Sequence, residues 1–293
     1  MTTTEFVEQL EPSLPEEPAG LEPVVRRRRR TPAMFLARWL FFLVCVLVWQ
    51  YFTARANSTV FTTPWHILGT IRTRWLSGPA SHLFLSAAVN TDILSSIELL
   101  LLGWVVSCVA GTVLGMLIGL SQILSDYTSA VLAFCRAMPP VMLLPVFLSL
   151  FHVGTELQLA TIVFGAVWPV LLNAVDGARS VDPGKIETAK AFRLGWWRRV
   201  FGIVLPAALP KIFTGFRVAL GLSLILLVLS QMTGATKGLG YVVNAAGLTF
   251  DYATMWAGIV VIGVIGYILN RLLIMLEYRV LAWHRGSTGL SEG

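Results

Sequence analysis

The sequence predicts an all-α membrane protein, a polytopic bundle of six spanning helices. Of its 293 residues, 56% are hydrophobic and only 13% are charged, whereas soluble domains carry about 25% charged residues. A spanning helix needs about 20 mainly apolar residues, because the hydrocarbon core is about 30 Å thick. Six stretches meet this requirement: residues 34–53, 94–120, 128–150, 157–178, 212–232 and 253–277.

The lysines and arginines predict the orientation of these spans, because short cytoplasmic loops retain positive charge. With the N-terminus inside, fifteen of the 22 basic residues fall on the cytoplasmic side and four on the outer side. We therefore expect both termini, and the polar segment 182–210, to lie in the cytoplasm.

Residues 1–33 precede the first span, and they combine six glutamates and several prolines with the run Arg26–Arg30. Such a segment buries too little apolar area to fold, so we expect a disordered cytoplasmic tail. The arginine run could bind anionic lipid headgroups or nucleic acid, but its role as a topology anchor requires neither and is favoured. It comes too late for a cleavable signal peptide, and no cleavage site follows the span 34–53.

Residues 54–92 form the predicted outer segment between the first two spans. Apolar residues recur there at helical spacing, which predicts an amphipathic helix at the membrane interface. They are Trp65, Ile67, Leu68, Ile71, Trp75 and Leu76. His66 and His82 have no partners at metal-ligand spacing, and the three cysteines lie in apolar runs, so we expect neither a metal site nor a disulfide.

The second span carries glycines at multiples of four: Gly103, Gly111, Gly115 and Gly119. Such a stripe lets another helix approach closely in lipid. Glu98, near the outer end of the same span, is a candidate for solute contact or gating because acids within membranes are costly.

The third span contains Pro139, Pro140 and Pro145, with Arg136 three residues before the first of them. Each proline removes a backbone donor, so this helix must bend or break. A broken helix at membrane depth can line a cavity or be a structural kink, and the residues favour neither.

The polar segment 182–210 lies between two membrane-length apolar stretches. Asp182 and Pro183 are a suitable helix start, and Glu187 opens a short helix ending near Gly195, with basic residues on its flank. This pattern predicts a docking surface for another protein, whereas an ordinary positive loop would not require the glutamate and the small residues. Residues 205–210 are expected to turn the chain into the fifth span.

Residues 234–240, GATKGLG, lack the preceding strand and the following helix start of a nucleotide-binding loop, and they predict a tight re-entrant turn near the outer end. Asp251 is a suitable cap for the sixth span. The five later spans form the predicted core, residues 94–280, and residues 281–293 a cytoplasmic tail.

The segment 182–210 resembles the EAA motif of permease subunits in bacterial ATP-binding-cassette importers. Glu187, Ala189 and the Leu205-Pro206 pair carry the resemblance, and residues 214–243 are similar to permeases for sulfonates, taurine and nitrate. The resemblance extends over roughly residues 60–280. This chain departs from the pattern with Thr188 in place of alanine and Arg193 in place of glycine.

The resemblance implies the type I importer fold in the bacterial cytoplasmic membrane and a coupling helix gripped by a cytoplasmic ATPase dimer. The implied coupling residues are Glu187, Thr188, Ala189, Ala191, Phe192, Arg193, Leu194 and Gly195. No P-loop is present, so ATP and magnesium belong to that partner and this chain binds no cofactor. A second permease copy, identical or paralogous, and an extracytoplasmic solute-binding protein are the other implied partners, and membrane lipid surrounds the spans.

The implied solute is a small anion of the sulfonate, taurine, nitrate, bicarbonate or aromatic carboxylate class. Fixed positive charges and a broken helix within the spans suit an anion. The candidate path residues are Arg136, Pro140, Arg217, Ser223, Gln231 and Glu98. Contacts between helices are the alternative role for these side chains. Glu98 and Gln231 also depart from the related permeases, which usually carry a basic residue and a glutamate there.

A secondary transporter is the alternative function. Inverted repeats and intramembrane acid relays would be expected of it, and neither is clear in this sequence. An intramembrane enzyme would need a catalytic constellation, whereas His152 and His284 stand alone. We therefore expect no catalytic residue and no metal ligand in this chain.

Overall fold

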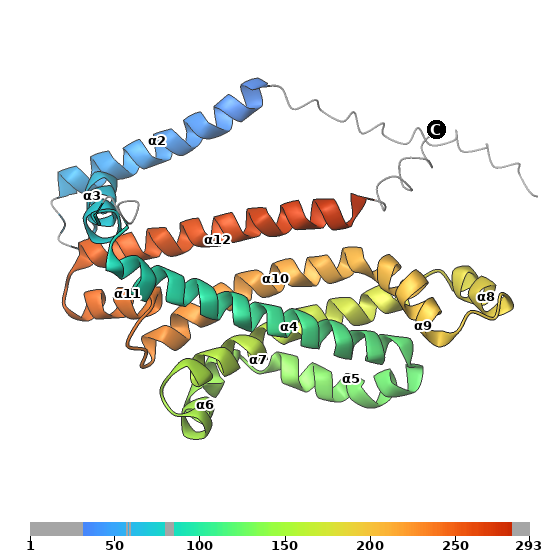
Figure 1. Ribbon diagram of the computed structural model, residues 1–293. Coiled ribbons are helices and arrows are strands. Elements are labelled where there is room, and N and C mark those ends of the chain that lie inside the picture. The colour runs from blue at the N-terminus through green and yellow to red at the C-terminus, as the bar shows by residue number, and fades with distance from the viewer. Residues whose placement is uncertain (1–31, 57, 59, 80–84, 283–293) are drawn as a thin grey trace, which may run out of the picture. The chain divides into compact units, whose positions relative to one another are not determined.

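A computed structural model shows the chain as helices joined by short connections (Figure 1). It describes residues 32–56, 58, 60–79 and 85–282, and every regular element in them is a helix. Within these described ranges, five helices are long and apolar enough to cross a membrane, and counting one bent pair as a span gives six. The predicted all-α class and number of spans are confirmed on that count. Most of both predicted tails, including Arg26–Arg30, lies outside the described residues.

The described chain divides after Val48 into two compact units. The first is the greater part of α2 (Pro32–Ala56), a helix that covers the predicted span 34–53. Its large apolar side chains are exposed, including Leu36 and Phe41. A helix that is hydrophobic all round requires an apolar environment, as a membrane span has.

The second unit begins with the last turns of α2 and continues into α3 (Pro64–Trp75). Thr63 caps α3 by accepting a hydrogen bond from the His66 amide. Ile67 and Trp75 are buried, whereas Trp65 is exposed. The predicted amphipathic helix is therefore present, with one apolar face packed against the protein.

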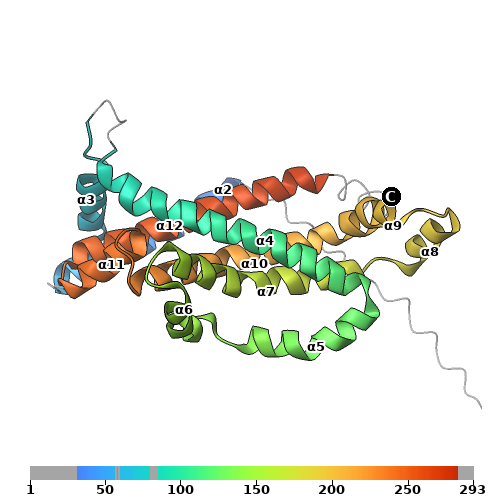
Figure 2. The ribbon, with the colours of Figure 1, turned by 60° about the horizontal axis from the view of Figure 1, so that its bottom comes forward.

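The core of this unit contains α4 (Ser95–Leu120) and α7 (Thr155–Arg179), which lie side by side (Figures 1 and 2). A Cβ added to Gly111 would lie 2.7 Å from the Val170 side chain. One added to Gly115 would lie 2.4 Å from the backbone oxygen of Leu171. The glycine stripe predicted for close helix packing is therefore confirmed, and we call this contact the α4–α7 seam.

The predicted span 128–150 is broken in two. The helices α5 (Gln122–Ala137) and α6 (Leu144–Phe151) meet at 84°, with the short 3₁₀ helix η3 (Pro140–Leu143) between them. Met138 and Pro139 are extended at the break because each precedes a proline, which disfavours the helical conformation. The predicted bend or break of this span is confirmed.

The third core helix is α10 (Leu205–Met232), which packs against α7 and also contacts α4. A Cβ on Gly177 would lie 3.0 Å from Ala208, and one on Gly215 would lie 3.0 Å from the Pro169 carbonyl oxygen. The Trp104 indole of α4 donates a 3.0 Å hydrogen bond to the Phe216 carbonyl of α10. Small residues and one tryptophan thus hold α4, α7 and α10 together.

Three short helices connect α7 to α10: α8 (Pro183–Ala191), α9 (Trp196–Arg199) and the π-helix η4 (Val200–Val204). Asp182 caps α8 by accepting a 2.9 Å hydrogen bond from the Gly184 amide. The turn predicted at residues 205–210 is wrong, because this segment is the start of α10. Pro206 lies in the first turn, where its missing amide hydrogen has no intrahelical role.

At the other end of the core, residues 233–238 turn the chain into α11 (Leu239–Leu248), which precedes α12 (Tyr252–Val280). Gly234 and Gly238 have φ values of 135° and 104°, which favour glycine, so a tight turn is confirmed at residues 233–238. The expectation that no helix starts there is wrong, because Leu239 and Gly240 already belong to α11. Asp251 caps α12 as predicted. Hydrogen bonds from the side chain and backbone of Thr254 to this carboxylate lower the pKa of Asp251.

Candidate functional site

The first candidate site is the segment 183–195, which protrudes at the end of α7 and α10 (Figure 1). Ala189 is buried at 2% exposure, whereas the Phe192 side chain is 76% exposed. Of the remaining predicted coupling residues, Leu194 is partly buried and the others are exposed: Glu187, Thr188, Ala191, Arg193 and Gly195. The segment therefore presents an apolar ring and mixed charges outward while a small residue seats it on the protein.

Backbone hydrogen bonds fix the end of α8 four residues before Gly195. The Leu194 amide donates to the Ala189 carbonyl at 3.0 Å, and the Arg193 amide donates to the Lys190 carbonyl at 2.9 Å. This pair of bonds is the Schellman motif, whose αL position is usually glycine. Arg193 occupies that position with φ of 52°, which costs a non-glycine residue about 1–2 kcal/mol. The predicted helix from Glu187 to Gly195 is therefore wrong in its bounds, because α8 begins at Pro183 and ends at Ala191, and residues 192–195 follow outside it.

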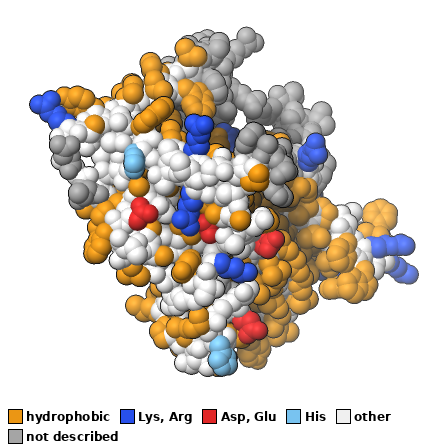
Figure 3. Space-filling model, turned by 60° about the vertical axis from the view of Figure 1, so that its left-hand side comes forward, with side chains coloured by type: hydrophobic (Ala, Val, Ile, Leu, Met, Phe, Trp, Pro, Cys, Tyr) orange, Lys and Arg blue, Asp and Glu red, His pale blue; other side chains and the backbone are white. Residues whose placement is uncertain are grey.

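The second candidate site is a cavity of about 270 Å³ at the opposite end of the core. Three separate parts of the chain line it: the start of α4, the start of α7, and the end of α10 with its following turn. The polar and charged lining residues are Ser95, Glu98, Thr155, Gln158, Gln231, Thr236 and Lys237. Figure 3, which brings this end forward, shows acidic and basic side chains interspersed on its surface.

Gln231 forms one wall of this cavity and is held by backbone from α11. Its Oε1 accepts a 2.8 Å hydrogen bond from the Gly240 amide, and its Nε2 donates to the Ser96 hydroxyl at 3.1 Å. A Cβ on Gly238 would lie 2.4 Å from the Gln231 amide nitrogen. Two glycines therefore form a socket that admits this side chain and fixes its position.

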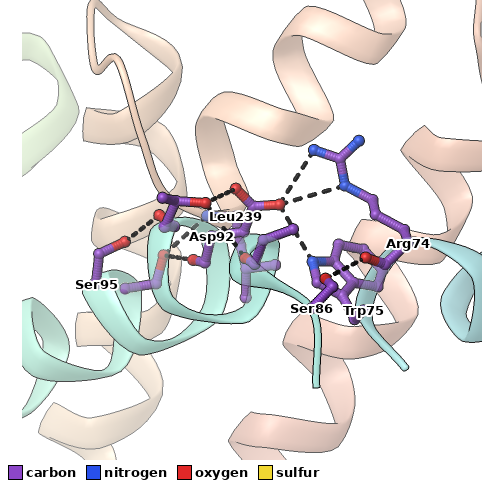
Figure 4. A network of polar contacts seen from close by, with 9 residues as sticks. Arg74, Trp75, Ser86, Asp92, Ser95 and Leu239 are labelled. Carbon is purple, nitrogen blue, oxygen red and sulfur yellow. Dashed lines mark hydrogen bonds and ion pairs between the residues drawn. The ribbon is translucent and has the colours of Figure 1, made fainter. Parts of the chain in front are cut away.

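A buried carboxylate supports the same end of the core. Asp92 is 6% exposed, and its Oδ2 accepts hydrogen bonds from the Arg74 guanidinium at 3.1 Å and from the Trp75 indole at 3.1 Å (Figure 4). The Ser96 hydroxyl, which accepts from the Leu239 amide at 2.8 Å, joins α4 to α11. The sequence reasoning missed Asp92, Ser96, Gln158 and Lys237. A polar cluster immediately before an apolar span was the available signal for the first two.

The six predicted path residues do not form one site. Glu98 and Gln231 line the cavity together. Arg136 is exposed in the last turn of α5, and Pro140 packs against Gly165 of α7. Arg217 forms an ion pair with Glu277 of α12, so its charge is already compensated.

Ser223, the sixth predicted path residue, is buried within α10 and has no hydrogen-bond partner for its hydroxyl among the described residues. It does not line the cavity. The described part of the chain also contains no group of three or more histidine, cysteine or acidic side chains that could hold a metal ion. The charged cavity and the protruding segment are thus the two sites with organised chemistry.

Similar proteins place this architecture in a family. The taurine transport system permease protein TauC of Escherichia coli is 28% identical over 80% of this chain and 85% of its own length. The nitrate import permease protein NrtB of Synechocystis sp. is 26% identical over 90% of this chain and 96% of its own length. The bicarbonate transport system permease protein CmpB of Synechococcus elongatus is 27% identical over 80% of this chain and 86% of its own.

Among solved structures, the inward-facing MetNI methionine ABC transporter matches 64% of this chain and 94% of its own chain, with a TM-score of 0.58 and 17% identity. That likeness concerns the fold. Residues 111–282, more than half of the chain, match the family described as binding-protein-dependent transport system inner membrane component. The protein belongs to this family, the membrane-embedded permease subunits of ATP-binding-cassette importers.

Proposed function

We propose that this chain carries a small anionic solute inward across the bacterial cytoplasmic membrane. A separate ATPase powers this transport by binding and moving the segment 183–195. The observation that carries the proposal is the rigid, exposed end of α8. Phe192 is 76% exposed beside the buried Ala189, so the segment offers an apolar contact that this chain leaves uncovered. Lys185, Lys190 and Arg193 add exposed positive charge around it.

The connections of α8 support a mechanical role. It follows α7 after three residues and leads through α9 and η4 into α10. At 1.5 Å per residue, α7 extends about 38 Å and α10 about 42 Å. Their far ends contribute Gln158 and Gln231 to the cavity. A displacement of α8 would therefore move two walls of the cavity through helices packed by small residues, as a rigid-body transition requires.

The anionic class of solute rests on the relatives and on the start of α7. The relatives are named for taurine, nitrate and bicarbonate. Gly154 and Thr155 line the cavity at the first turn of α7, where amide groups have no intrahelical acceptor and the helix dipole favours negative charge. Lys237 provides a positive side chain on the same cavity.

Three partners complete the proposed importer: a cytoplasmic ATPase dimer that holds ATP and magnesium, a second permease copy, and an extracytoplasmic solute-binding protein. The positive-inside arrangement supports a cytoplasmic position for the segment 183–195. On that orientation, the cavity lies at the outer end of the core, where a binding protein would release solute. The same arrangement makes each end of α7 and α10 a contact for a different partner.

The test is co-purification of the ATPase with the full-length permease, followed by uptake in sealed vesicles. We expect Phe192→Ala to reduce recovered ATPase and ATP-driven uptake by at least about tenfold, as loss of a buried aromatic anchor does. Tyr127→Ala is the matched control, because Tyr127 is 81% exposed but lies on α5. Unchanged co-purification would contradict the proposal. Uptake that persists without ATP would instead indicate a secondary transporter.

A further inference from the structure

The cavity carries opposite charges that do not neutralise each other. Glu98 and Lys237 both line it, yet the described residues contain no ion pair or hydrogen bond of either side chain. Both side chains are exposed, so neither is committed to holding the fold. An anion-selective site would have no use for the carboxylate, which would repel the solute.

A buried amide in the same cavity also lacks a partner. Gln158 is only 7% exposed, and no residue in the described part of the chain hydrogen-bonds its side chain. Its amide group can donate two hydrogen bonds and accept two. Its amide atoms are not sealed from the cavity, so a polar occupant can hydrogen-bond with them there. The neighbouring Gln231, by contrast, is fully engaged with Ser96 and Gly240.

The size of the cavity limits the occupant. Its volume of about 270 Å³ lies below the range of roughly 300–1,000 Å³ that drug-sized ligands occupy. Its lining is mixed, because Leu99, Leu102 and Val153 add apolar surface beside the polar and charged residues. The space suits a short aliphatic chain with a charged group at each end.

We infer that this cavity is a transit site for a small zwitterion, a solute with an ammonium group and an acidic group. Glu98 receives the ammonium, Lys237 and the first turn of α7 receive the acidic group, and Gln158 provides hydrogen bonds to the solute between them. The inference rests on the proposed function and changes its solute from a simple anion to an amino-substituted sulfonate or carboxylate, whose acidic group is the anionic part. It also gives a role to an acid and a base that leave the fold unaffected.

The test uses calorimetric titration of the purified permease with its co-purified ATPase and no binding protein. Three probes separate the charges: taurine has both groups, ethanesulfonate lacks the ammonium, and ethylammonium lacks the sulfonate. We expect Glu98→Gln to weaken taurine and ethylammonium binding by about tenfold or more and to spare ethanesulfonate. Lys237→Gln should weaken taurine and ethanesulfonate similarly and spare ethylammonium.

Two exposed charges at the same end provide matched controls, because Glu156 and Arg72 do not line the cavity. Glu156→Gln and Arg72→Gln should bind all three probes as the unmodified complex does. Unaltered thermal unfolding of the Glu98 and Lys237 variants should show that their fold is intact. Equal affinity of the unmodified complex for taurine and ethanesulfonate, or taurine binding unchanged in Glu98→Gln, would overturn the site. ATP-independent uptake would overturn the proposed function instead.

Discussion

The two ends of the core are built in opposite ways. At the α8 end, backbone hydrogen bonds fix a contiguous segment and its side chains face outward, as the 76% exposure of Phe192 shows. At the cavity end, side chains hold together segments far apart in sequence, as in the contact of Ser96 with Gln231. The first arrangement suits repeated gripping by a partner. The second suits precise positioning of groups around a small space.

A substitution in the α4–α7 seam should have the largest effect, because it destabilises the core that joins both ends. Gly115→Leu would place side-chain carbon against the Leu171 carbonyl oxygen, where an added Cβ already comes within 2.4 Å. Because backbone cannot yield like a flexible side chain, we expect a loss of about 3 kcal/mol in unfolding free energy. Thermal unfolding in detergent measures it. Gly263→Leu on α12, where nothing lies within 4 Å, is the control and should unfold at nearly the unmodified temperature.

Gln231→Leu should damage the cavity end alone. The substitution keeps the side-chain bulk but leaves the Gly240 amide without its 2.8 Å acceptor, at a cost of about 2 kcal/mol. Faster hydrogen exchange of the Gly240 amide would report the loss, while the Leu194 amide in the α8 end stays protected. Gln122→Leu, which removes only an exposed hydrogen bond to Asp126, is the comparison variant. Equal effects of both leucines would contradict the socket.

Arg193→Gly should stabilise the backbone at the end of α8. Glycine adopts the φ of 52° without strain, so we expect the local structure to gain about 1 kcal/mol. Slower hydrogen exchange of the Leu194 amide would show it, because that amide bonds to Ala189 across the motif. Arg198→Gly removes an equal charge from the helix α9, where glycine costs about 1 kcal/mol. Stabilisation by both substitutions would mean that charge rather than backbone strain is responsible.

Acid should weaken the cavity end through the cap of α12. The pKa of Asp251 is lowered in the folded protein, so its carboxylate stabilises the fold at pH values above the pKa of an unfolded aspartate, which is about 3.9. This stabilisation disappears as the pH falls through the lower, folded value. Asp251→Ala should cost about 1 kcal/mol at neutral pH and flatten this part of the pH profile. The measurement is the unfolding temperature of both proteins between neutral pH and pH 3. If Asp251→Ala showed the same pH profile as the unmodified protein, the cap would be unimportant.

The sequence predicted the features that depend on nearby residues. Helical length, the glycine stripe, the proline break and the Asp251 cap each follow from spacing within one segment, and the structure bears them out. The turn predicted at residues 205–210 was wrong, because this segment is the first part of α10 and Pro206 lies in its first turn. The cavity could not be predicted, because Glu98, Gln158 and Lys237 meet only through the packing of α4, α7 and α10.

The α4–α7 seam also sets a direction for evolutionary change. Every other amino acid is bulkier than glycine, so drift at Gly103, Gly111, Gly115 or Gly119 can only push the two helices apart. At Gly115, a smaller residue on α7 could not compensate for a larger one on α4, because the opposing atom is the backbone oxygen of Leu171. Among natural variants of this protein, these four positions should therefore remain glycine almost without exception, while the solute-facing charges remain free to diversify.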